Sequence, residues 1–425
     1  MTPAESEKPW IIVVALSVDP HLGSEPGKGW WWSNALSEHF RLRIVTQRRS
    51  EAVCQNEAIP RSEGWVFHTT ERDVSTWKFP VGYLQYRSWL QEALSKCREI
   101  VEQFPVVGLC HVTLGSFRFL PAYNQLGIPY TVGPLGGGEC SPASFIWQRR
   151  MPAMEKVKEA MRPLINNSSA LVPPLRACMK SASLVLTTSI ESERVVRRIG
   201  AKKTAVVFSD AYETPVDFEA ITEQRSLQMP SLGKIIHLYW QGRPLWWKGP
   251  DLALKIAQKA LIKGVNIKIS MVCNWDTPFG REVKALAEEW GVASNIEFVG
   301  YMARQEFLEM ARRHHAFLGT SLHDSGGIPL IEAQALGLPC LTLALGGNRI
   351  SACPDAGISG SAKDPEDYVN RVVDHLAVWQ ENPATWLEES QRAQQFAHNF
   401  TINRLRNYVN DLIVPAFSVS ETKQP

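Results

Sequence analysis

Short apolar runs alternate with helical segments along almost the whole chain, and this alternation constrains the fold more than any other feature of the sequence. The predicted strands are 11–16, 43–46, 106–112, 130–132, 184–188, 205–208, 235–239, 267–272, 296–299, 316–319 and 340–343. Several are continuously apolar, which is typical of strands covered on both faces. Helical patterns such as 251–262 and 281–290 lie between them. The sequence therefore predicts an α/β fold with parallel sheets that carry helices on both sides.

The alternation pauses once, over 213–233, where polar residues and prolines replace the apolar runs. A chain of 425 residues is too long for one ordinary domain, and roughly equal lengths remain on each side of the pause. Ligands of open parallel sheets bind at the carboxyl ends of the strands, so we expect two Rossmann-like domains that face each other across a cleft. Helical patterns at 365–378 and 384–412 follow the last strand. The predicted parts are a first domain 1–215, a linker 216–233, a second domain 234–395, a helix 396–418 that crosses back to the first domain, and a disordered tail 419–425.

Charge and cysteine usage exclude several classes of protein. The 45 basic and 43 acidic residues nearly balance, so the net charge of +2 gives no indication of a nucleic-acid partner. The eight cysteines are scattered singly, without a C-x-x-C pair, which favours reduced, buried thiols over a disulfide framework or a zinc site. The first apolar stretch, 10–17, is too short for a signal-peptide core or a membrane span. We therefore expect a soluble cytoplasmic protein.

The segment HDSGGIPLIEAQALGLP, residues 323–339, joins the end of a predicted strand to a glycine-rich corner and a helix opened by Pro329. Unpaired N–H groups and the helix dipole favour oxyanions at such a helix start. The corner residues that would offer these groups are Ser325, Gly326 and Gly327. Asp324 in the corner and Glu332 in the first helical turn suit a ligand with both hydroxyls and phosphate. An ordinary crossover turn, with a glutamate that complements the dipole, explains the same residues.

A second loop with charged residues follows the predicted strand 235–239. Arg243 and Lys248 are cations that bracket this loop, and they would neutralise a diphosphate bound opposite the glycine-rich corner. A solvated pair of cations beside surface tryptophans is the alternative.

Loops at strand ends of the first domain carry weaker signals. The loop 17–30 contains Gly23 and further glycines ahead of a helix expected to begin near Trp30, which suits either close approach to a phosphate or a tight turn. His111 ends a strand, where it would bond a sugar hydroxyl or polarise an acceptor, or serve the packing alone. The loop 133–139 contains Gly137 and ends in the carboxylate of Glu139.

Taken in order, these motifs resemble those of the retaining GT-B glycosyltransferases, and in particular the family 4 (glycosyl transferases group 1) type. The resemblance rests on GSEPGKGW, CHVT, GPLGGGE, WQGRPLWWKG, DSGGIPLIEAQALGLP and the GGN at 346–348, which occur in this order over nearly the whole chain. It implies a GT-B fold and a cytoplasmic enzyme that moves a sugar, with retention, from a nucleoside-diphosphate sugar to an acceptor hydroxyl. It also implies no cofactor beyond the nucleotide sugar.

The resemblance assigns roles to individual residues. Arg243 and Lys248 match the cations that hold the donor's diphosphate, Glu332 matches the acid that binds the ribose hydroxyls, and His111 matches a histidine near the transferred sugar. Asp324 matches the first acid of the family's E-x7-E motif, although the family has glutamate there, so we expect donor binding to be kept and the sugar preference to change. The resemblance also implies donor contacts at Gly23, Ser325, Gly326, Gly327, Ile328, Asn274, Tyr301 and Met302, and an acceptor side at Gly137 and Glu139.

Metal use, catalysis and the acceptor are less constrained. No Asp-x-Asp signature is present, so we expect protein cations to take the place of a metal ion at the leaving phosphate. A non-catalytic, sugar-nucleotide-binding component of a glycan assembly complex is the alternative function. The acceptor is expected to be a glycan, a lipid-linked or a small molecule. The basic, amphipathic stretch 147–176 either docks on an anionic membrane, at its inner face, or is a solvated helical face, and its spaced charges favour the second reading.

Overall fold

The computed structural model of the protein describes residues 8–56, 64–75, 81–211, 225 and 234–418, which group into two compact units. The first unit comprises Met1–Gly138, Leu164–Glu213 and Phe400–Pro425, and the second comprises Glu139–Pro163 and Thr214–Asn399. Apart from Arg225, the predicted linker 216–233 lies outside the described residues, as does the predicted tail 419–425. Residues 139–163 precede the linker in the chain yet pack with the second unit.

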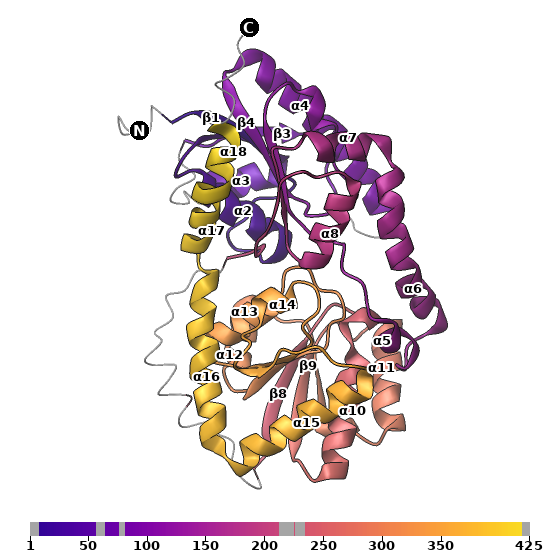
Figure 1. Ribbon diagram of the computed structural model, residues 1–425. Helices are drawn as coiled ribbons and strands as arrows, with labels where there is room; N and C mark the ends of the chain where they lie inside the picture. The colour runs from indigo at the N-terminus through magenta and orange to yellow at the C-terminus, as the bar shows by residue number, and fades with distance from the viewer. Residues whose placement is uncertain (1–7, 57–63, 76–80, 212–224, 226–233, 419–425) are drawn as a thin grey trace. The chain divides into compact units, whose positions relative to one another are not determined.

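The first unit is a seven-stranded sheet in the order β3-β2-β1-β4-β5-β6-β7, with every described strand pair parallel. Its strands are β1 (Trp10–Ala15), β2 (Arg41–Gln47), β3 (Val66–Thr70), β4 (Val106–Thr113), β5 (Tyr130–Leu135), β6 (Leu184–Thr187) and β7 (Thr204–Val206). The helices α4 (Val81–Gln103), α7 (Pro173–Ser181) and α8 (Ile190–Ile199) share one apolar core with the sheet. Further helices of this unit are α2 (Ser24–Leu36), α3 (Arg48–Asn56), α17 (Ile402–Tyr408) and α18 (Val414–Ser418), of which α2, α17 and α18 lie on the opposite side of the sheet in Figure 1.

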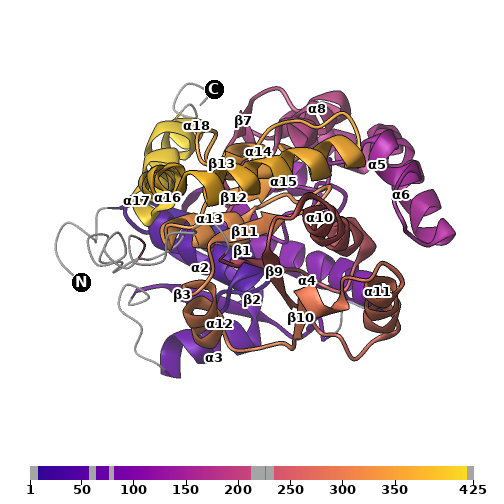
Figure 2. The same ribbon diagram turned by 90° about the horizontal axis from the view of Figure 1, so that it is seen from below.

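The second unit is a six-stranded sheet in the order β10-β9-β8-β11-β12-β13, again parallel throughout the described residues. Its strands are β8 (Ile236–Gln241), β9 (Ile267–Val272), β10 (Ile296–Val299), β11 (Ala316–Gly319), β12 (Cys340–Thr342) and β13 (Gly357–Ile358). Ile236, Leu238 and Trp240 of β8 enter a core with α10 (Pro250–Lys263), α11 (Pro278–Glu289) and α15 (Pro365–Glu381). Tyr239 enters a second core with α12 (Arg304–Ala311) and α13 (Ile328–Ala335). Successive side chains of β8 therefore reach helices on both faces of the sheet. Figure 2 shows these helices around the strands from below.

The α/β prediction is confirmed, and each of the eleven predicted strands overlaps an observed one. The strands β3 and β13 were not predicted. β3 is a half-exposed edge strand in which three of the five residues are polar, and β13 has only two residues. In both units the strand order reverses direction once, between β1 and β4 and between β8 and β11. Such reversal points are where open parallel sheets bind their ligands.

The C-terminal helical pattern does not form the single helix expected over 384–412. The chain forms α16 (Pro383–Ala397), a short turn at His398–Phe400, and then α17, a π-helical stretch (Val409–Ile413) and α18. Phe400 is buried against Phe208 of the first unit, with ring centroids 5.2 Å apart. The break therefore lies where the chain passes from the second unit to the first.

Candidate functional site

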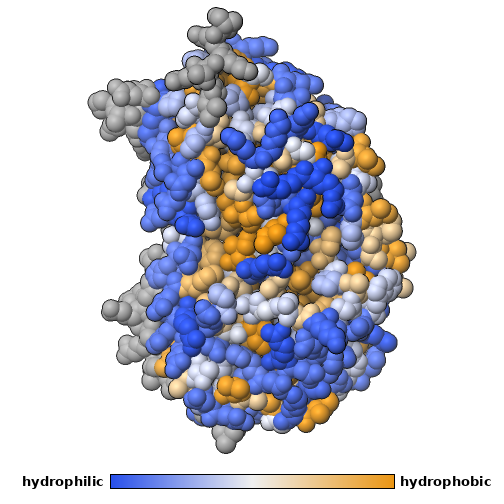
Figure 3. Space-filling view, in the orientation of Figure 1, coloured by the Kyte–Doolittle hydropathy of each residue, from blue (hydrophilic) through white to orange (hydrophobic). Residues whose placement is uncertain are grey.

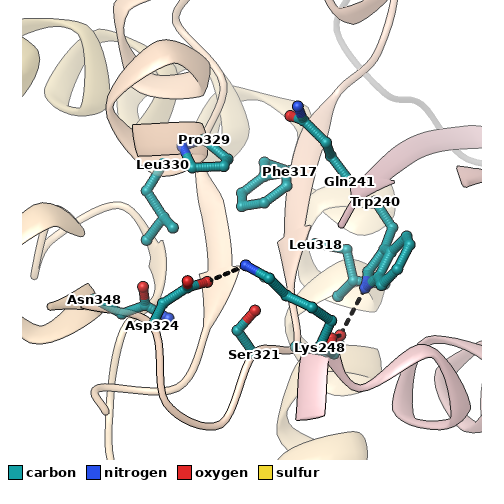
Figure 4. Close-up of a pocket in the computed structure, with 12 residues that line it drawn as sticks. Trp240, Gln241, Lys248, Phe317, Leu318, Ser321, Asp324, Pro329, Leu330 and Asn348 are labelled. Carbon is teal, nitrogen blue, oxygen red and sulfur yellow. Dashed lines mark hydrogen bonds and ion pairs between the residues drawn. The ribbon is translucent and has the colours of Figure 1, made fainter. Parts of the chain in front are cut away.

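A pocket of the second unit lies at the carboxyl ends of β8 and β11, where the strand order reverses (Figure 4). The residues that line it are Trp240, Gln241, Lys248, Phe317, Leu318, Gly319, Thr320, Ser321, Asp324, Pro329, Leu330 and Asn348. Its volume is ≈ 10 Å³, about the space of one water molecule. Two of the residues predicted to bind a donor, Lys248 and Asp324, therefore share one narrow pocket.

The backbone of Lys248 is tied to the end of β11. Lys248 ends a short turn, η3 (Trp246–Lys248), and Gly249 follows it with a φ of 73°. A Cβ at Gly249 would lie 2.4 Å from the Thr320 carbonyl oxygen, so the close approach needs glycine. The Thr320 hydroxyl donates to the Lys248 carbonyl at 2.7 Å and accepts from the Trp240 indole at 2.8 Å. Buried hydrogen bonds thus aim the lysine into the pocket.

Lys248 and Asp324 form an ion pair inside the pocket. Lys248 Nζ lies 2.6 Å from Asp324 Oδ2, and the side chains are 10% and 20% exposed. Burial by itself would raise the pKa of Asp324, but the Lys248 ammonium and hydrogen bonds from Lys248 and Ser321 lower that pKa below its ordinary value. The carboxylate is therefore ionised at neutral pH, and it neutralises a cation that sequence reasoning had assigned to a diphosphate.

The loop that carries Asp324 packs against the glycines of the GGN sequence. Gly347 donates its N–H to the Asp324 carbonyl at 2.8 Å. A Cβ at Gly346 would lie 2.3 Å from the same oxygen, and one at Gly347 would lie 2.2 Å from the Ser325 carbonyl oxygen. Only glycines allow the two loops to approach so closely, and this contact brings Asn348 to the pocket wall.

Asn348 is a site residue that sequence reasoning missed, although its signal was present in the GGN sequence. It is fully buried, and its Nδ2 donates to Thr342 at 3.2 Å. Its Oδ1 has no hydrogen-bond partner among the described residues. Because an unsatisfied buried carbonyl oxygen costs about 1–3 kcal/mol, this oxygen favours a ligand that brings a donor such as a hydroxyl.

The helix α13 begins beside the pocket. Gly327 precedes it with a φ of 65°, and a Cβ there would lie 2.8 Å from the Ser351 side chain. The N–H groups at the start of a helix have no partner within it, so the stretch from Ser325 to Ile328 is suited to an anion. The helix begins at Ile328, which makes Glu332 its fifth residue. The expectation that Glu332 lies in the first turn is therefore wrong by a small margin.

Arg243 and the predicted base-binding residues are more exposed. The Arg243 guanidinium lies 5.8 Å from the Trp247 ring centroid, and Lys248 Nζ lies 4.7 Å from the same ring. Asn274 follows β9 and is exposed, and Tyr301 follows β10 and is 89% exposed. Met302 is partly buried against the core that includes α12 and α13. Asn274 follows β9, which neighbours β8, whereas Tyr301 and Met302 follow β10, the next strand outward, and none of the three lines the pocket.

In the first unit, His111 lies on β4 at the point where the strand order reverses. It is fully buried, its Nδ1 lies 2.7 Å from the Tyr123 hydroxyl, and burial lowers its pKa to about 4. His111 is therefore neutral at physiological pH. A neutral imidazole at this point suits hydrogen bonding better than charge stabilisation.

The glycine-rich loop after β1 is shorter than expected. The helix α2 begins at Ser24, six residues before Trp30, so only Gly23 of the three glycines remains in the loop, where it is exposed. A Cβ at Gly27 would lie 2.4 Å from the Leu22 carbonyl oxygen, and one at Gly29 would lie 2.1 Å from that of Ser17. Close packing thus explains these two glycines.

The structure divides the predicted acceptor-side residues between the two units. Gly137 belongs to the first unit, has a φ of 99° and accepts a hydrogen bond from Arg118 at 2.7 Å. Glu139 belongs to the second unit and is buried, and a Cβ at Gly346 would lie 2.7 Å from its side chain. Glu139 therefore lies beside the GGN loop that supports Asp324, a contact that the sequence did not indicate.

Seven of the eight cysteines are buried, in agreement with the prediction of buried thiols. The described residues contain no group of three or more His, Cys, Asp or Glu side chains that could hold a metal ion. In the described part of the chain, no helix is both long and apolar enough to cross a membrane.

Comparison with solved structures shows the fold. Sucrose-phosphate synthase from Thermosynechococcus elongatus matches with a TM-score of 0.65 and 15% identity, covering 97% of this chain and 100% of that one. Anabaena HepE in complex with UDP and glucose matches with a TM-score of 0.59 and 12% identity, covering 96% of this chain and 100% of that one. Together with the two parallel-sheet units, these likenesses define a protein of the GT-B fold.

Sequence comparison points to one family. Residues 232–397 match the family Glycosyl transferases group 1. The D-inositol 3-phosphate glycosyltransferase of Mycolicibacterium smegmatis is 25% identical over 252 residues, which cover 55% of each chain. The match to the enzyme of that name from Xylanimonas cellulosilytica is 27% identical and covers 44% of this chain and 46% of the relative. The chain thus spans about half the length of the curated relatives it matches.

Proposed function

We propose that the protein is a retaining glycosyltransferase that moves a sugar from a nucleoside-diphosphate sugar to a hydroxyl of a glycan, lipid-linked or small-molecule acceptor. The observation that carries this proposal is the Lys248–Asp324 pair, which lies with the unpartnered Asn348 oxygen beside the start of α13. One pocket wall thus offers a cation for a phosphate, and a carboxylate and an amide oxygen for sugar hydroxyls. The family match over 232–397 contains this whole wall.

The chemistry follows from where charge develops. Breaking the bond between sugar and diphosphate leaves negative charge on the departing phosphate. Lys248, Arg243 and the backbone N–H groups of Ser325 to Ile328 would stabilise that charge, and removing one such group typically costs about 10²–10³ in rate. Asp324 and Asn348 would orient the sugar, and Glu332 would bind the ribose hydroxyls. In this proposal the two cations do the work of a divalent metal, and no cofactor beyond the nucleotide sugar is needed.

The remaining predicted residues have supporting roles in the proposal. His111, held neutral by burial, would donate a hydrogen bond to the transferred sugar or the acceptor. Gly23 would allow the first unit's loop to approach the donor phosphates, and Asn274, Tyr301 and Met302 would contact the base. A carboxylate nucleophile is not part of the proposal, and the departing phosphate would help to deprotonate the acceptor.

The experiment begins with thermal stabilisation of the purified protein by UDP-, GDP-, ADP- and dTDP-sugars. A ligand at a hundredfold its Kd stabilises a protein by about 2.7 kcal/mol. We expect sugars of one nucleotide to stabilise the wild type but not Arg243→Ala or Glu332→Ala. When an acceptor is added, the protein should release nucleotide from the matching nucleotide sugar. This release should persist in EDTA, which removes divalent metal ions. Inositol phosphates belong in the acceptor panel because the relatives are named for one. Binding without turnover would favour a non-catalytic component, and no stabilisation by any donor would refute the proposed site.

The acceptor proposal includes contact with a membrane surface, which helix α6 (Ala153–Ser168) supports. Glu159 and Asn166 on this helix are buried, whereas its apolar side chains are 45–66% exposed. These apolar residues are Met154, Val157, Met161, Leu164 and Ile165. At 100° per residue they occupy one stripe opposite the buried polar pair. The helix is therefore inverted relative to an ordinary surface helix, and an apolar surface follows it along the right-hand edge of Figure 3.

The spaced charges alone favour a solvated face, but together with the exposed apolar stripe they favour an anionic membrane as its occupant. Apart from the buried Arg149 and Glu159, the segment 147–180 contains six Lys and Arg residues against one Glu, and Trp147 beside the helix is 57% exposed. Such a combination binds acidic lipid surfaces. We expect co-sedimentation with phosphatidylcholine vesicles that contain phosphatidylglycerol, and loss of it in Met154→Ser/Met161→Ser but not in Ile262→Ser, whose side chain is 75% exposed elsewhere. Vesicle binding unchanged by the double variant, or a dimer that it dissociates, would contradict a lipid occupant.

A further inference from the structure

The segment 139–163 reaches the turn that carries Lys248, although it lies far ahead of that turn in the chain. Arg149 donates from Nε to Asp251 at 3.0 Å and from a terminal nitrogen to the Trp246 carbonyl at 2.8 Å. The Arg149 and Asp251 side chains are 1% and 2% exposed. This one buried guanidinium therefore holds both ends of the stretch Trp246–Asp251, which contains η3.

A second charged residue of this segment, Glu159, contacts His323, whose ring stacks on Trp247 of the same turn. Its Oε1 lies 3.0 Å from His323 Nε2, and its Oε2 accepts from the Ser141 hydroxyl at 2.8 Å. The side chains of His323 and Glu159 are 3% and 10% exposed. Burial alone would raise the pKa of Glu159, but the bonds from His323 and Ser141 lower it below its ordinary value. Since an ionised carboxylate only accepts hydrogen bonds, His323 must carry a proton on Nε2.

His323 connects Glu159 with the cations of the site. Its ring stacks on Trp247, with centroids 4.2 Å apart and planes 25° apart. The Lys248 ammonium and the Arg243 guanidinium lie 4.7 Å and 5.8 Å from the same Trp247 ring. His323 also immediately precedes Asp324 in the chain. The orientation of one imidazole ring is therefore coupled to both members of the Lys248–Asp324 pair.

We propose that Glu159 is a positioning residue of the donor site, which acts through His323 and Trp247 to hold Lys248 and Asp324 in their relative places. This inference rests on the proposed glycosyl transfer and adds to it a residue outside the family match, which begins at residue 232. A carboxylate that served packing alone would be replaceable by an apolar group of similar size, because burying a charge costs more than burying a methyl group. Here the carboxylate satisfies two donors and fixes the tautomer of a ring stacked beneath the site.

The test compares three variants of the full chain. Glu159→Gln keeps an acceptor for His323 and a group that can bond Ser141, whereas Glu159→Leu keeps the volume and removes both bonds. Glu155→Leu is the matched control, because Glu155 lies one turn earlier on α6 and pairs with the exposed Lys158 at 2.5 Å. Steady-state release of nucleotide gives kcat and KM, and urea unfolding reports whether each variant is folded.

We expect Glu159→Leu to lower kcat about 10-fold to 100-fold, by misplacing the groups that stabilise the leaving phosphate, with a smaller change in KM. Glu159→Gln should stay within about threefold of the wild type, and Glu155→Leu should be unchanged. A folded Glu159→Leu with wild-type kcat would overturn the inference, as would Gln being as impaired as Leu.

A separate readout distinguishes failure of this inference from failure of the proposed function. If the wild type turns over no nucleotide sugar, the proposed transfer fails, and calorimetric titration with inorganic pyrophosphate then tests the positioning alone. Tighter binding to the wild type and Glu159→Gln than to Glu159→Leu would sustain the role of Glu159. Equal affinity of pyrophosphate for the wild type, Glu159→Gln and Glu159→Leu, or no binding to any of them, would refute the positioning role of Glu159.

Discussion

Replacing Asp324 by asparagine is expected to tighten the binding of a nucleoside diphosphate while it slows sugar transfer. In the free protein the Asp324 carboxylate lies 2.6 Å from the Lys248 ammonium, in a pocket where the two side chains are 10% and 20% exposed. A phosphate that binds Lys248 must share this cation with the carboxylate. Asparagine keeps the shape of the side chain and removes the competing charge.

The magnitude follows from the same distances. A phosphate oxygen within hydrogen-bond distance of Lys248 would come within about 4–5 Å of the carboxylate, where two like charges repel by roughly 3–4 kcal/mol at an effective dielectric constant of 20. Residual solvent access and the loss of the Lys248 partner reduce the net gain. We therefore expect diphosphate to bind about tenfold more tightly, or roughly 1.4 kcal/mol. Transfer should fall by about 10² because the sugar loses its charged partner.

The variant should also be less stable without ligand. Removing one member of a largely buried ion pair costs about 3–5 kcal/mol, and partial exposure places this pair near the lower value. Because the folded-state pKa of Asp324 is depressed, the pair's contribution is present above the unfolded-state pKa of about 3.9 and is lost as the pH falls through the lower folded-state value. The stability difference between wild type and variant should therefore vanish only below about pH 4.

Calorimetric titration with the nucleoside diphosphate, initial rates of transfer and urea unfolding test these expectations together. Asp374→Asn is the matched control, since Asp374 pairs with Lys263 on the surface, with side chains 63% and 36% exposed. It should leave all three measurements nearly unchanged. Weaker diphosphate binding in Asp324→Asn would refute the reasoning, because it would mean that the carboxylate supports the phosphate site rather than competing with it.

Three further outcomes are expected. Arg149→Met should cost about 3–5 kcal/mol of unfolding free energy, because it leaves Asp251 buried without its partner. Arg150→Met, at an exposed pair, should cost at most about 1 kcal/mol. Equal losses for the two variants in chemical denaturation would show that burial of the pair does not matter. Between pH 6.5 and 4, His111 should lower the unfolding free energy of the wild type by roughly 3 kcal/mol, because unfolding lets this neutral side chain take up a proton. In urea unfolding measured across that pH range, His111→Gln should lack this part of the pH dependence. Asn348→Ala should raise the KM for the donor sugar about tenfold with little effect on free nucleotide binding, and an equal loss of both would show that Asn348 does not contact the sugar.

Local patterns in the sequence were sufficient for the elements that position the site. The strands β9, β10 and β11 begin and end at the predicted residues because their apolar runs have definite limits. The helix after the glycine-rich corner starts within one residue of Pro329, because proline and glycine act on the backbone of their own neighbourhood. The same reasoning did not predict the helix break at Phe400, because that residue packs against Phe208, which is distant in the sequence.

The sequence by itself thus determined the strand and helix order, the fold class and the residue types at the carboxyl ends of the strands. Only the tertiary structure decided which of those residues meet. Lys248 and Asp324 are 76 residues apart in the chain and His323 and Glu159 are 164 apart, yet both are hydrogen-bonded pairs. The physical reason is that periodicity and turn residues express interactions over a few positions, whereas pairing between distant side chains depends on how strands and helices pack.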